Sequence, residues 1–259
     1  MPVFNRKTPF YGFYVIFRSL NVLRGGRTVV SSQQASCLAT RLSGAEDSGS
    51  YTLDVDGKEG PLPEFAVYCD FSGLDTMTVL HHNSEDRRRV SSGGDFHLQV
   101  AYQGSLEQIQ AVVQKSARCQ QFIRYECRNS PLRLAENVSW WETTANTRMY
   151  SWGGAGGRTG QCGCSVQQNC QPSPDQSCNC DANDTVWRTD EGYLTDLTTL
   201  PVVNVSLTAR EGEGYLTVGP LVCVDESEFI PNEWWQIVLG TAILVFAAFF
   251  TFMPAFVRK

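Results

Sequence analysis

Apolar and polar residues alternate along two short stretches that follow Cys37. In residues 51–55 every second side chain is apolar, and Asp56-Gly57, a pair typical of turns, comes next. Residues 65–69 repeat the alternation and end at Cys69. The pattern predicts two facing β-strands. Because Cys37 precedes the first strand and Cys69 ends the second, we expect a disulfide between these two cysteines.

The period changes to that of a helix in residues 105–117. Its apolar residues recur at helical spacing and are Leu106, Ile109, Val112, Val113 and Ala117. Ser105 and Gln108 form a capping box at the start. We therefore expect a helix that ends near Cys119, followed by a strand over residues 121–127. A Cys119–Cys127 bridge would then fasten the helix to the strand.

Aromatic residues are concentrated in residues 139–152, which predict a hairpin and lead into the glycine-rich sequence WGGAGG. No strand-to-helix context surrounds these glycines, so they do not indicate a phosphate-binding loop. We expect loops around Trp140, Trp141 and Trp152, together with the acids of residues 181–191, to form a binding surface.

The longest apolar run covers residues 234–257 and contains no charged side chain. A helix of this length spans roughly 36 Å at about 1.5 Å per residue, enough for a hydrocarbon core of about 30 Å. Acids precede the run and Arg258-Lys259 follow it, which predicts a cytosolic C-terminus. A buried globular helix is the alternative, although such helices rarely run this long without a polar face.

The expected organisation has an exported domain on the other side of this membrane span. Residues 1–35 form either an atypical signal peptide or the end of an upstream region, because no clean cleavage site follows their short apolar run. Residues 36–224 form the extracellular domain and residues 225–233 a juxtamembrane linker. Residues 234–257 form the transmembrane helix and residues 258–259 a cytosolic stub. The expected location is the plasma membrane, with a single span.

The overall charge argues against nucleic acid as a partner. The formal net charge is −6 and the isoelectric point is near 5.1, whereas binding to phosphates requires a basic face. One basic run, Arg87-Arg88-Arg89, follows two acids. It is interpreted as a solvated turn, with a patch for acidic glycans or lipid headgroups as the alternative.

Ten cysteines, an even number, suit disulfides in an oxidising compartment. They are Cys37, Cys69, Cys119, Cys127, Cys162, Cys164, Cys170, Cys178, Cys180 and Cys223. The C-x-C spacings in residues 162–180 disfavour a structural zinc site, and no C-x-x-C redox motif is present. We expect all ten to pair, but the pairing of the last six is not determined by the sequence.

Neither histidine nor cysteine forms a recognisable catalytic motif. His81, His82 and His97 lie near no nucleophile elbow or zinc-protease helix, and the cysteines have a structural use. The sequence therefore predicts a protein that is not an enzyme.

Many short motifs of this chain occur in a known order. They are SCLATRLSG, PEFAVYCDF, TVLHHNSEDRRRV, CQQFIRYECRNS, YSWGGAGG, CNCDANDTVWRTDEGYLTD, LPV and GYLTVGPLVC. Together they resemble the fibrinogen-like module of contactin-associated (Caspr, neurexin IV-type) cell-surface proteins, over about residues 36–224. The resemblance implies an α+β, disulfide-rich extracellular module in a single-pass adhesion or recognition protein. Laminin-G, discoidin and EGF-like modules are absent from this sequence, so contactin binding and cytoskeletal linkage are not carried over.

The acidic turn at residues 181–184 is a candidate cation site. Asp181, Asn183 and Asp184 offer the oxygen ligands that calcium prefers. However, the run lacks the glycine and the closing glutamate of an EF-hand, and it differs from the calcium loop of fibrinogen and ficolin domains. Asx turns are the alternative. No other cofactor is expected.

Three sequons fit an exported glycoprotein: those of Asn137, Asn183 and Asn204. A glycan on Asn183 would compete with calcium.

Two functions are consistent with the sequence. The first is a membrane-anchored recognition or cell-adhesion module that binds a protein or glycan. The second is a structural, membrane-proximal spacer domain of a larger receptor or channel-associated protein, without a ligand of its own.

Overall fold

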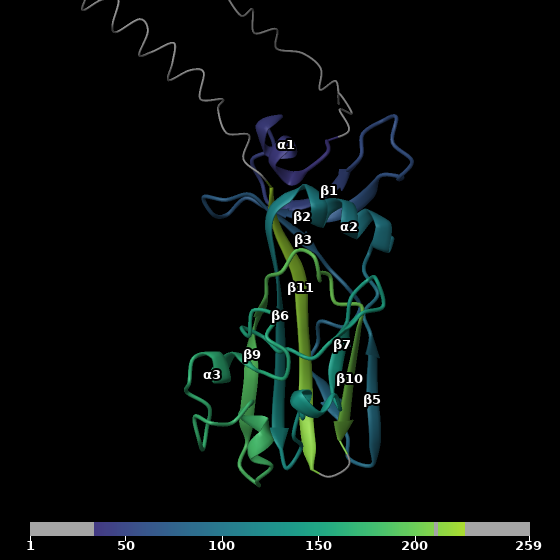
Figure 1. Cartoon of the computed structure of the whole chain (residues 1–259). Helices are drawn as coiled ribbons and strands as arrows, with labels where there is room; N and C mark the ends of the chain where they lie inside the picture. Colours follow the sequence, from purple (N-terminus) through teal and green to yellow (C-terminus); the bar gives the residue numbers. More distant parts are fainter. Residues whose placement is uncertain (1–33, 210–211, 226–259) are drawn as a thin grey trace, which may run out of the picture. The chain divides into compact units, whose positions relative to one another are not determined.

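Two antiparallel sheets form the described part of the chain (Figure 1). The computed structural model describes residues 34–209 and 212–225. The larger sheet has the order β1-β2-β3-β11-β6-β9, and β4 also pairs with β11; the smaller has the order β5-β10-β7-β8. The strands are β1 (Gly49–Leu53), β2 (Phe65–Asp70), β3 (Met77–Leu80), β4 (Arg88–Val90), β5 (Gly94–Gln99), β6 (Ser116–Arg128), β7 (Trp140–Glu142), β8 (Arg148–Met149), β9 (Arg188–Leu194), β10 (Asn204–Ala209) and β11 (Glu213–Asp225).

Helix is a minor component of the described chain. The helices are α1 (Cys37–Leu42), α2 (Leu106–Lys115), α3 (Gly163–Val166) and the 3₁₀ turns η1 (Leu134–Glu136) and η2 (Cys180–Ala182). The expected α+β, disulfide-rich class is therefore confirmed only in part. The disulfides are present, but the fold is mostly β. None of these helices is long and apolar enough to cross a membrane. The expected span at 234–257 and most of the N-terminal segment lie outside the described residues.

Strands β1 and β2 pair as the alternation predicts, with Tyr51 opposite Val67. The capping box of α2 is also confirmed, since Ser105 and Gln108 bond each other's backbone. The helix is shorter than expected. Ser116 adopts an extended backbone and begins β6, so Ala117 belongs to a strand.

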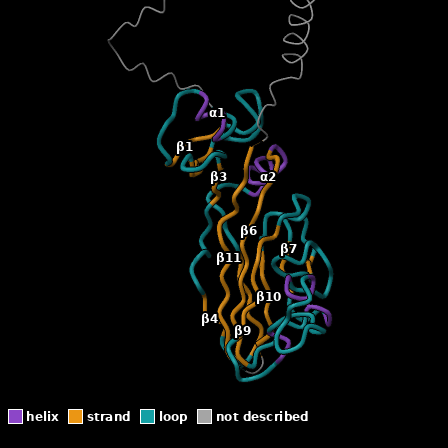
Figure 2. The backbone as a smooth tube through the Cα atoms, turned by 90° about the vertical axis from the view of Figure 1, so that its left-hand side faces the viewer, coloured by secondary structure: helices purple, strands orange, loops and turns teal. Residues whose placement is uncertain are grey.

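The core lies between the two sheets and under the cysteine-rich loops. Side chains at alternate positions of β6 and β11 point into it, and Ile123, Leu216 and Val218 are fully buried. Figure 2 shows these loops on the same side of the large sheet as β7 and β10. None of the described elements covers the opposite side of β4, β11, β6 and β9 (Figure 2). That side is called the outer sheet face below.

Five disulfides hold the fold together and use all ten cysteines. The expected Cys37–Cys69 bridge is present. The others join Cys119 to Cys223, Cys127 to Cys180, Cys162 to Cys178 and Cys164 to Cys170.

The expected Cys119–Cys127 bridge is wrong. Both cysteines lie in the one continuous strand β6, eight positions apart, which is about 26 Å at roughly 3.3 Å per residue. A disulfide needs Cα atoms within about 7 Å. Each cysteine instead reaches another element: Cys119 lies directly opposite Cys223 of β11, and Cys127 reaches η2.

Candidate interaction surface

Two of the three tryptophans expected at a binding surface are part of the core. Trp141 is 1% exposed and its Nε1 donates to Ser151 O at 2.7 Å. Trp152 is 0% exposed and its Nε1 donates to Asp190 O at 3.0 Å. Trp140 is half-buried beneath the guanidinium of Arg148, 4.3 Å from the ring centre. The prediction of a binding surface around these tryptophans is therefore wrong for Trp141 and Trp152, which lie in the core.

The glycine-rich loop explains why Trp152 is buried. Gly153 lies so close to β9 that a Cβ added to it would stand 2.4 Å from Gly192 N. Gly154 N donates to Tyr193 O at 3.1 Å. The glycines thus allow a backbone-to-backbone approach that carries the indole into the core.

The acidic turn is occupied by protein partners. Asp184 binds Arg188 through two hydrogen bonds, of 3.2 and 2.6 Å, and this guanidinium holds the pKa of Asp184 below its usual range. Asp181 Oδ1 accepts from Arg133 N at 2.9 Å, and burial raises the pKa of Asp181. Asn183 ends η2 with an exposed side chain and a left-handed backbone. This geometry lends the calcium site no support.

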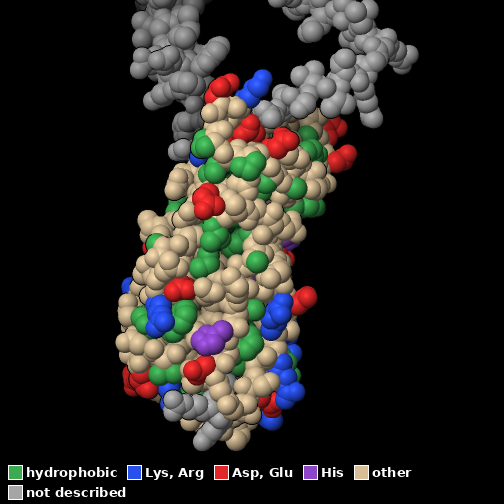
Figure 3. All heavy atoms as spheres, turned by 90° about the vertical axis from the view of Figure 1, so that its right-hand side faces the viewer, with side chains coloured by type: hydrophobic (Ala, Val, Ile, Leu, Met, Phe, Trp, Pro, Cys, Tyr) green, Lys and Arg blue, Asp and Glu red, His purple; other side chains and the backbone are tan. Residues whose placement is uncertain are grey.

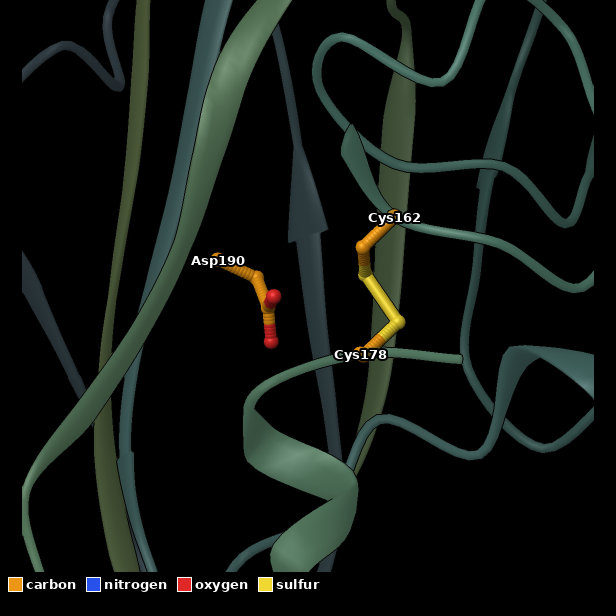
Figure 4. Close-up of side chains that lie close together, drawn as sticks. All are labelled: Cys162, Cys178 and Asp190. Atoms are coloured by element: carbon orange, nitrogen blue, oxygen red, sulfur yellow. A yellow bond between two sulfur atoms is a disulfide. The ribbon is translucent and has the colours of Figure 1, made fainter. Parts of the chain in front are cut away.

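One buried group of potential metal ligands occurs among the described residues: Cys162, Cys178 and Asp190, with ligand atoms within 4.8 Å of one another. Figure 4 shows why it is not a metal site in this state. The two sulfur atoms are joined in a disulfide, so neither is a thiolate. The Asp190 carboxylate accepts hydrogen bonds from Asn179 N at 2.9 Å and Cys180 N at 2.8 Å. It therefore holds in place the turn at residues 178–180, which carries two bridged cysteines and is called the cystine turn below.

The three sequon asparagines differ in accessibility. Asn137 and Asn183 are exposed, and both have left-handed backbones at the ends of 3₁₀ turns. Asn204 lies in β10, between β5 and β7, and its Nδ2 donates to Glu142 Oε2 at 2.7 Å. Glycosylation of Asn204 would have to break this bond.

The outer sheet face carries a cluster of arginine, aromatic and glutamate side chains. Its members are Arg87, Arg89, Phe122, Arg124, Glu126, Arg128, Trp187, Glu191, Tyr193, Glu213 and Tyr215. We call this set the Arg–aromatic cluster. Trp187 is 44% and Tyr193 50% exposed, whereas most large apolar side chains of the domain are buried.

Strand register places these side chains in rows across the sheet. One row runs from Arg89 through Tyr215 to Glu126, on β4, β11 and β6. In the next, Arg124 of β6 stands opposite Glu191 of β9. Directly opposite residues share one face of a sheet. Side chains from β4, β11, β6 and β9 therefore lie side by side on the outer sheet face.

Ion pairs and ring contacts order the cluster. Arg87 bonds Glu126 at 2.6 Å and lies over the Tyr215 ring at 3.3 Å, and this guanidinium holds the pKa of Glu126 below its usual range. Trp187 packs against the same tyrosine with ring centres 5.8 Å apart. The arginine run is therefore solvent-exposed at Arg87 and Arg89, as expected, but it enters strand β4 rather than forming a turn.

Two further arginines converge on one carboxylate. Arg89 and Arg128 both pair with Glu213, and Arg128 also lies 5.5 Å from the Trp187 ring centre. Arg124 pairs with Glu191 and contacts Phe122. The cluster thus has four arginines and three glutamates on a chain whose net charge is −6.

The sequence of β6 contains a signal for this face. Residues 122–128 alternate between buried side chains and a second series, in which Phe122, Arg124 and Glu126 are half-buried and Arg128 is exposed. A polar row containing aromatic and charged residues within a predicted strand indicates a solvated face. By contrast, Figure 3 shows the β5 side of the domain, where hydrophobic side chains are scattered among polar ones.

The chain is 34% identical to contactin-associated protein 1 of Rattus norvegicus and of Mus musculus, over 216 residues that make up 80% of this chain. Identity to the Homo sapiens protein of the same name is 32% over 238 residues, 88% of this chain. The chain is related to the contactin-associated proteins. It spans 15% to 17% of the length of these contactin-associated relatives. No family model matches it.

Proposed function

We propose that this chain is a membrane-anchored extracellular recognition module with a fibrinogen-like fold, and that it binds a protein partner through the Arg–aromatic cluster. The plasma membrane is its location, with residues 234–257 as the single span. The relationship to contactin-associated proteins and the resemblance of the ordered motifs to a fibrinogen-like module support this proposal.

The exposed Arg–aromatic cluster is the observation that carries the binding role. Tryptophan, tyrosine and arginine are the residues that most often contribute large binding energies in protein interfaces. Here they lie on a sheet face with no described cover, already ordered by Glu126, Glu191 and Glu213. Ordering before binding lowers the entropic cost of association. A broad, ordered face of this kind suits a protein partner.

Five disulfides support an extracellular location, because cystines persist in oxidising compartments. They also support a binding role rather than a catalytic one, since no cysteine is left as a thiol nucleophile. His82 has a structural use as well: its Nε2 lies 2.9 Å from Gly219 O, and burial lowers its pKa.

The test is a binding assay with the full chain displayed on mammalian cells. Purified cell-surface ectodomains serve as probes, with contactin included because of the relatives' name. We expect saturable binding of at least one ectodomain. Arg128→Ala and Tyr193→Ala should each weaken it by about tenfold, a loss typical of an interface hot spot. Tyr68→Ala is the matched control, because this exposed tyrosine lies on β2, away from the cluster.

Binding that is equal in all three variants, or absent for every probe, would contradict the proposal. The domain would then be better described as a structural spacer without a ligand of its own.

A further inference from the structure

A small pocket opens at the edge of β9, beside the Arg–aromatic cluster. It has a volume of about 330 Å³ and is lined by Asn169, Gln171, Asn179, Trp187, Arg188 and Thr189. Within the described chain β9 pairs with β6 alone, and at its other edge Asn179 Nδ2 donates to Thr189 O at 2.9 Å. The volume is at the lower end of the range for ligand pockets, which suits one small ring.

The polar groups of this pocket are neutral hydrogen-bonding groups. Three carboxamides and one hydroxyl line it, and each both donates and accepts. The side chains of Gln171 and Thr189 make no hydrogen bond to the described residues and are exposed. The one charged lining residue, Arg188, has its guanidinium paired with Asp184.

Trp187 adds an exposed aromatic ring to these neutral groups. Its indole is 44% exposed, and the negative face of an aromatic ring attracts the C–H groups of an apolar ring face. A pyranose combines such a face with hydroxyl groups that both donate and accept hydrogen bonds. An anion would lack a free cation here, because Arg188 is paired with Asp184. A purely apolar ligand would leave the side chains of Gln171 and Thr189 without hydrogen-bond partners.

Disulfides fix the segments that carry the amides. Asn169 and Gln171 flank Cys170, which is bonded to Cys164. Asn179 lies between Cys178 and Cys180, both of which are bridged. The pocket is therefore ordered before a ligand arrives, which reduces the entropic cost of binding.

From these observations we propose that the β9-edge pocket binds one neutral pyranose residue of an oligosaccharide, stacked on Trp187 and hydrogen-bonded by Gln171 and Thr189. The pocket shares Trp187 with the Arg–aromatic cluster, but its hydrogen-bonding groups lie outside the cluster. The proposal does not depend on the protein-binding role.

The experiment applies the purified full chain in detergent to an immobilised panel of neutral, sialylated and sulfated oligosaccharides. Neutral oligosaccharides should be retained, and the matching free monosaccharide at millimolar concentration should compete. Gln171→Ala and Trp187→Ala should each weaken retention by about tenfold or more. Tyr68→Ala, an exposed ring elsewhere, and Arg124→Ala, in the cluster but not in the pocket, should retain the same sugars. Melting curves and non-reducing peptide maps identify any variant that is misfolded.

Three outcomes would overturn the pocket proposal: no retained neutral sugar, retention of acidic sugars alone, or equal retention by Gln171→Ala and wild type. These outcomes leave the protein-binding proposal untouched. Conversely, loss of ectodomain binding in Arg128→Ala with unchanged sugar retention would separate the two sites.

Discussion

Asp190 carries a buried carboxyl group on which the cystine turn depends. It lies on β9 and is 2% exposed. Burial raises its pKa to about 6, although hydrogen bonds from the backbone of Cys180 and Asn179 favour the charged form. The nearby Asp181 raises the pKa further. The folded protein therefore binds this proton more tightly than the unfolded chain does.

The pH dependence of stability follows from this pKa. An aspartate with a normal pKa of 3.8 in the unfolded chain and about 6 in the fold destabilises the fold progressively as pH rises between these values. The change is roughly 3 kcal/mol across that window, at about 1.4 kcal/mol per pH unit. We expect Asp190→Asn to flatten the profile of unfolding free energy between pH 4 and pH 6.

Chemical denaturation across this range measures the effect. Asp184→Asn is the control. Because the pKa of Asp184 is lowered, this residue does not titrate between pH 4 and pH 6, and its replacement should leave the slope in that range unchanged. A profile in Asp190→Asn with the wild-type slope would contradict this role for Asp190.

At the scale of elements, the glycine-rich loop packs against β9, a strand that lies far from it in the sequence. Gly153 and Gly192 touch through their backbones, and the contact buries Trp152 between the loop and the sheet. An added methyl group has no free volume there.

We expect Gly153→Ala to destabilise the domain by about 1–3 kcal/mol, the usual cost of overpacking a tight contact. Thermal melting measures the change. Gly94→Ala is the matched control, because a Cβ at Gly94 meets nothing within 4 Å. If both variants melt at the same temperature, the close backbone approach is not what positions the loop.

Local patterns predicted local elements well. The period-2 rows gave β1 and β2 with their bridge Cys37–Cys69, and the capping box gave α2. Partners distant in the sequence were not predictable. Cys119 pairs with a strand 104 residues away, and no local pattern specifies that neighbour.

The interaction surface shows the same limit. An exposed tryptophan and a buried one look alike in a sequence, and the burial of Trp152 depends on a contact between residues 153 and 192. The Arg–aromatic cluster likewise exists only because β4, β6, β9 and β11 lie side by side. Two parts of it are visible in the sequence, the basic run Arg87-Arg88-Arg89 and the alternation of residues 122–128.

At the scale of the whole molecule, the disulfides differ in the length of chain that they close. Cys119–Cys223 closes 104 residues and Cys164–Cys170 only 6. In the chain-entropy description, these loops correspond to about 5 and about 2 kcal/mol of stabilisation. The Cys127–Cys180 bridge within the longer loop reduces the first figure.

We therefore expect the double variant Cys119→Ala/Cys223→Ala to lose more stability than Cys164→Ala/Cys170→Ala. Denaturant unfolding of both, with the remaining four bridges verified by non-reducing peptide mapping, measures the difference. A larger loss from the short loop would contradict the entropic account and indicate that packing around residues 164–170 dominates.

The central claim is that the outer sheet face recognises a partner, and a charge swap tests it most directly. Arg124 and Glu191 face each other on β6 and β9, so Arg124→Glu with Glu191→Arg retains their ion pair while reversing the charges that a partner meets. Binding to the partner ectodomain should fall by about tenfold or more, with Tm close to that of the wild type. Wild-type affinity in the swapped protein would contradict the claim.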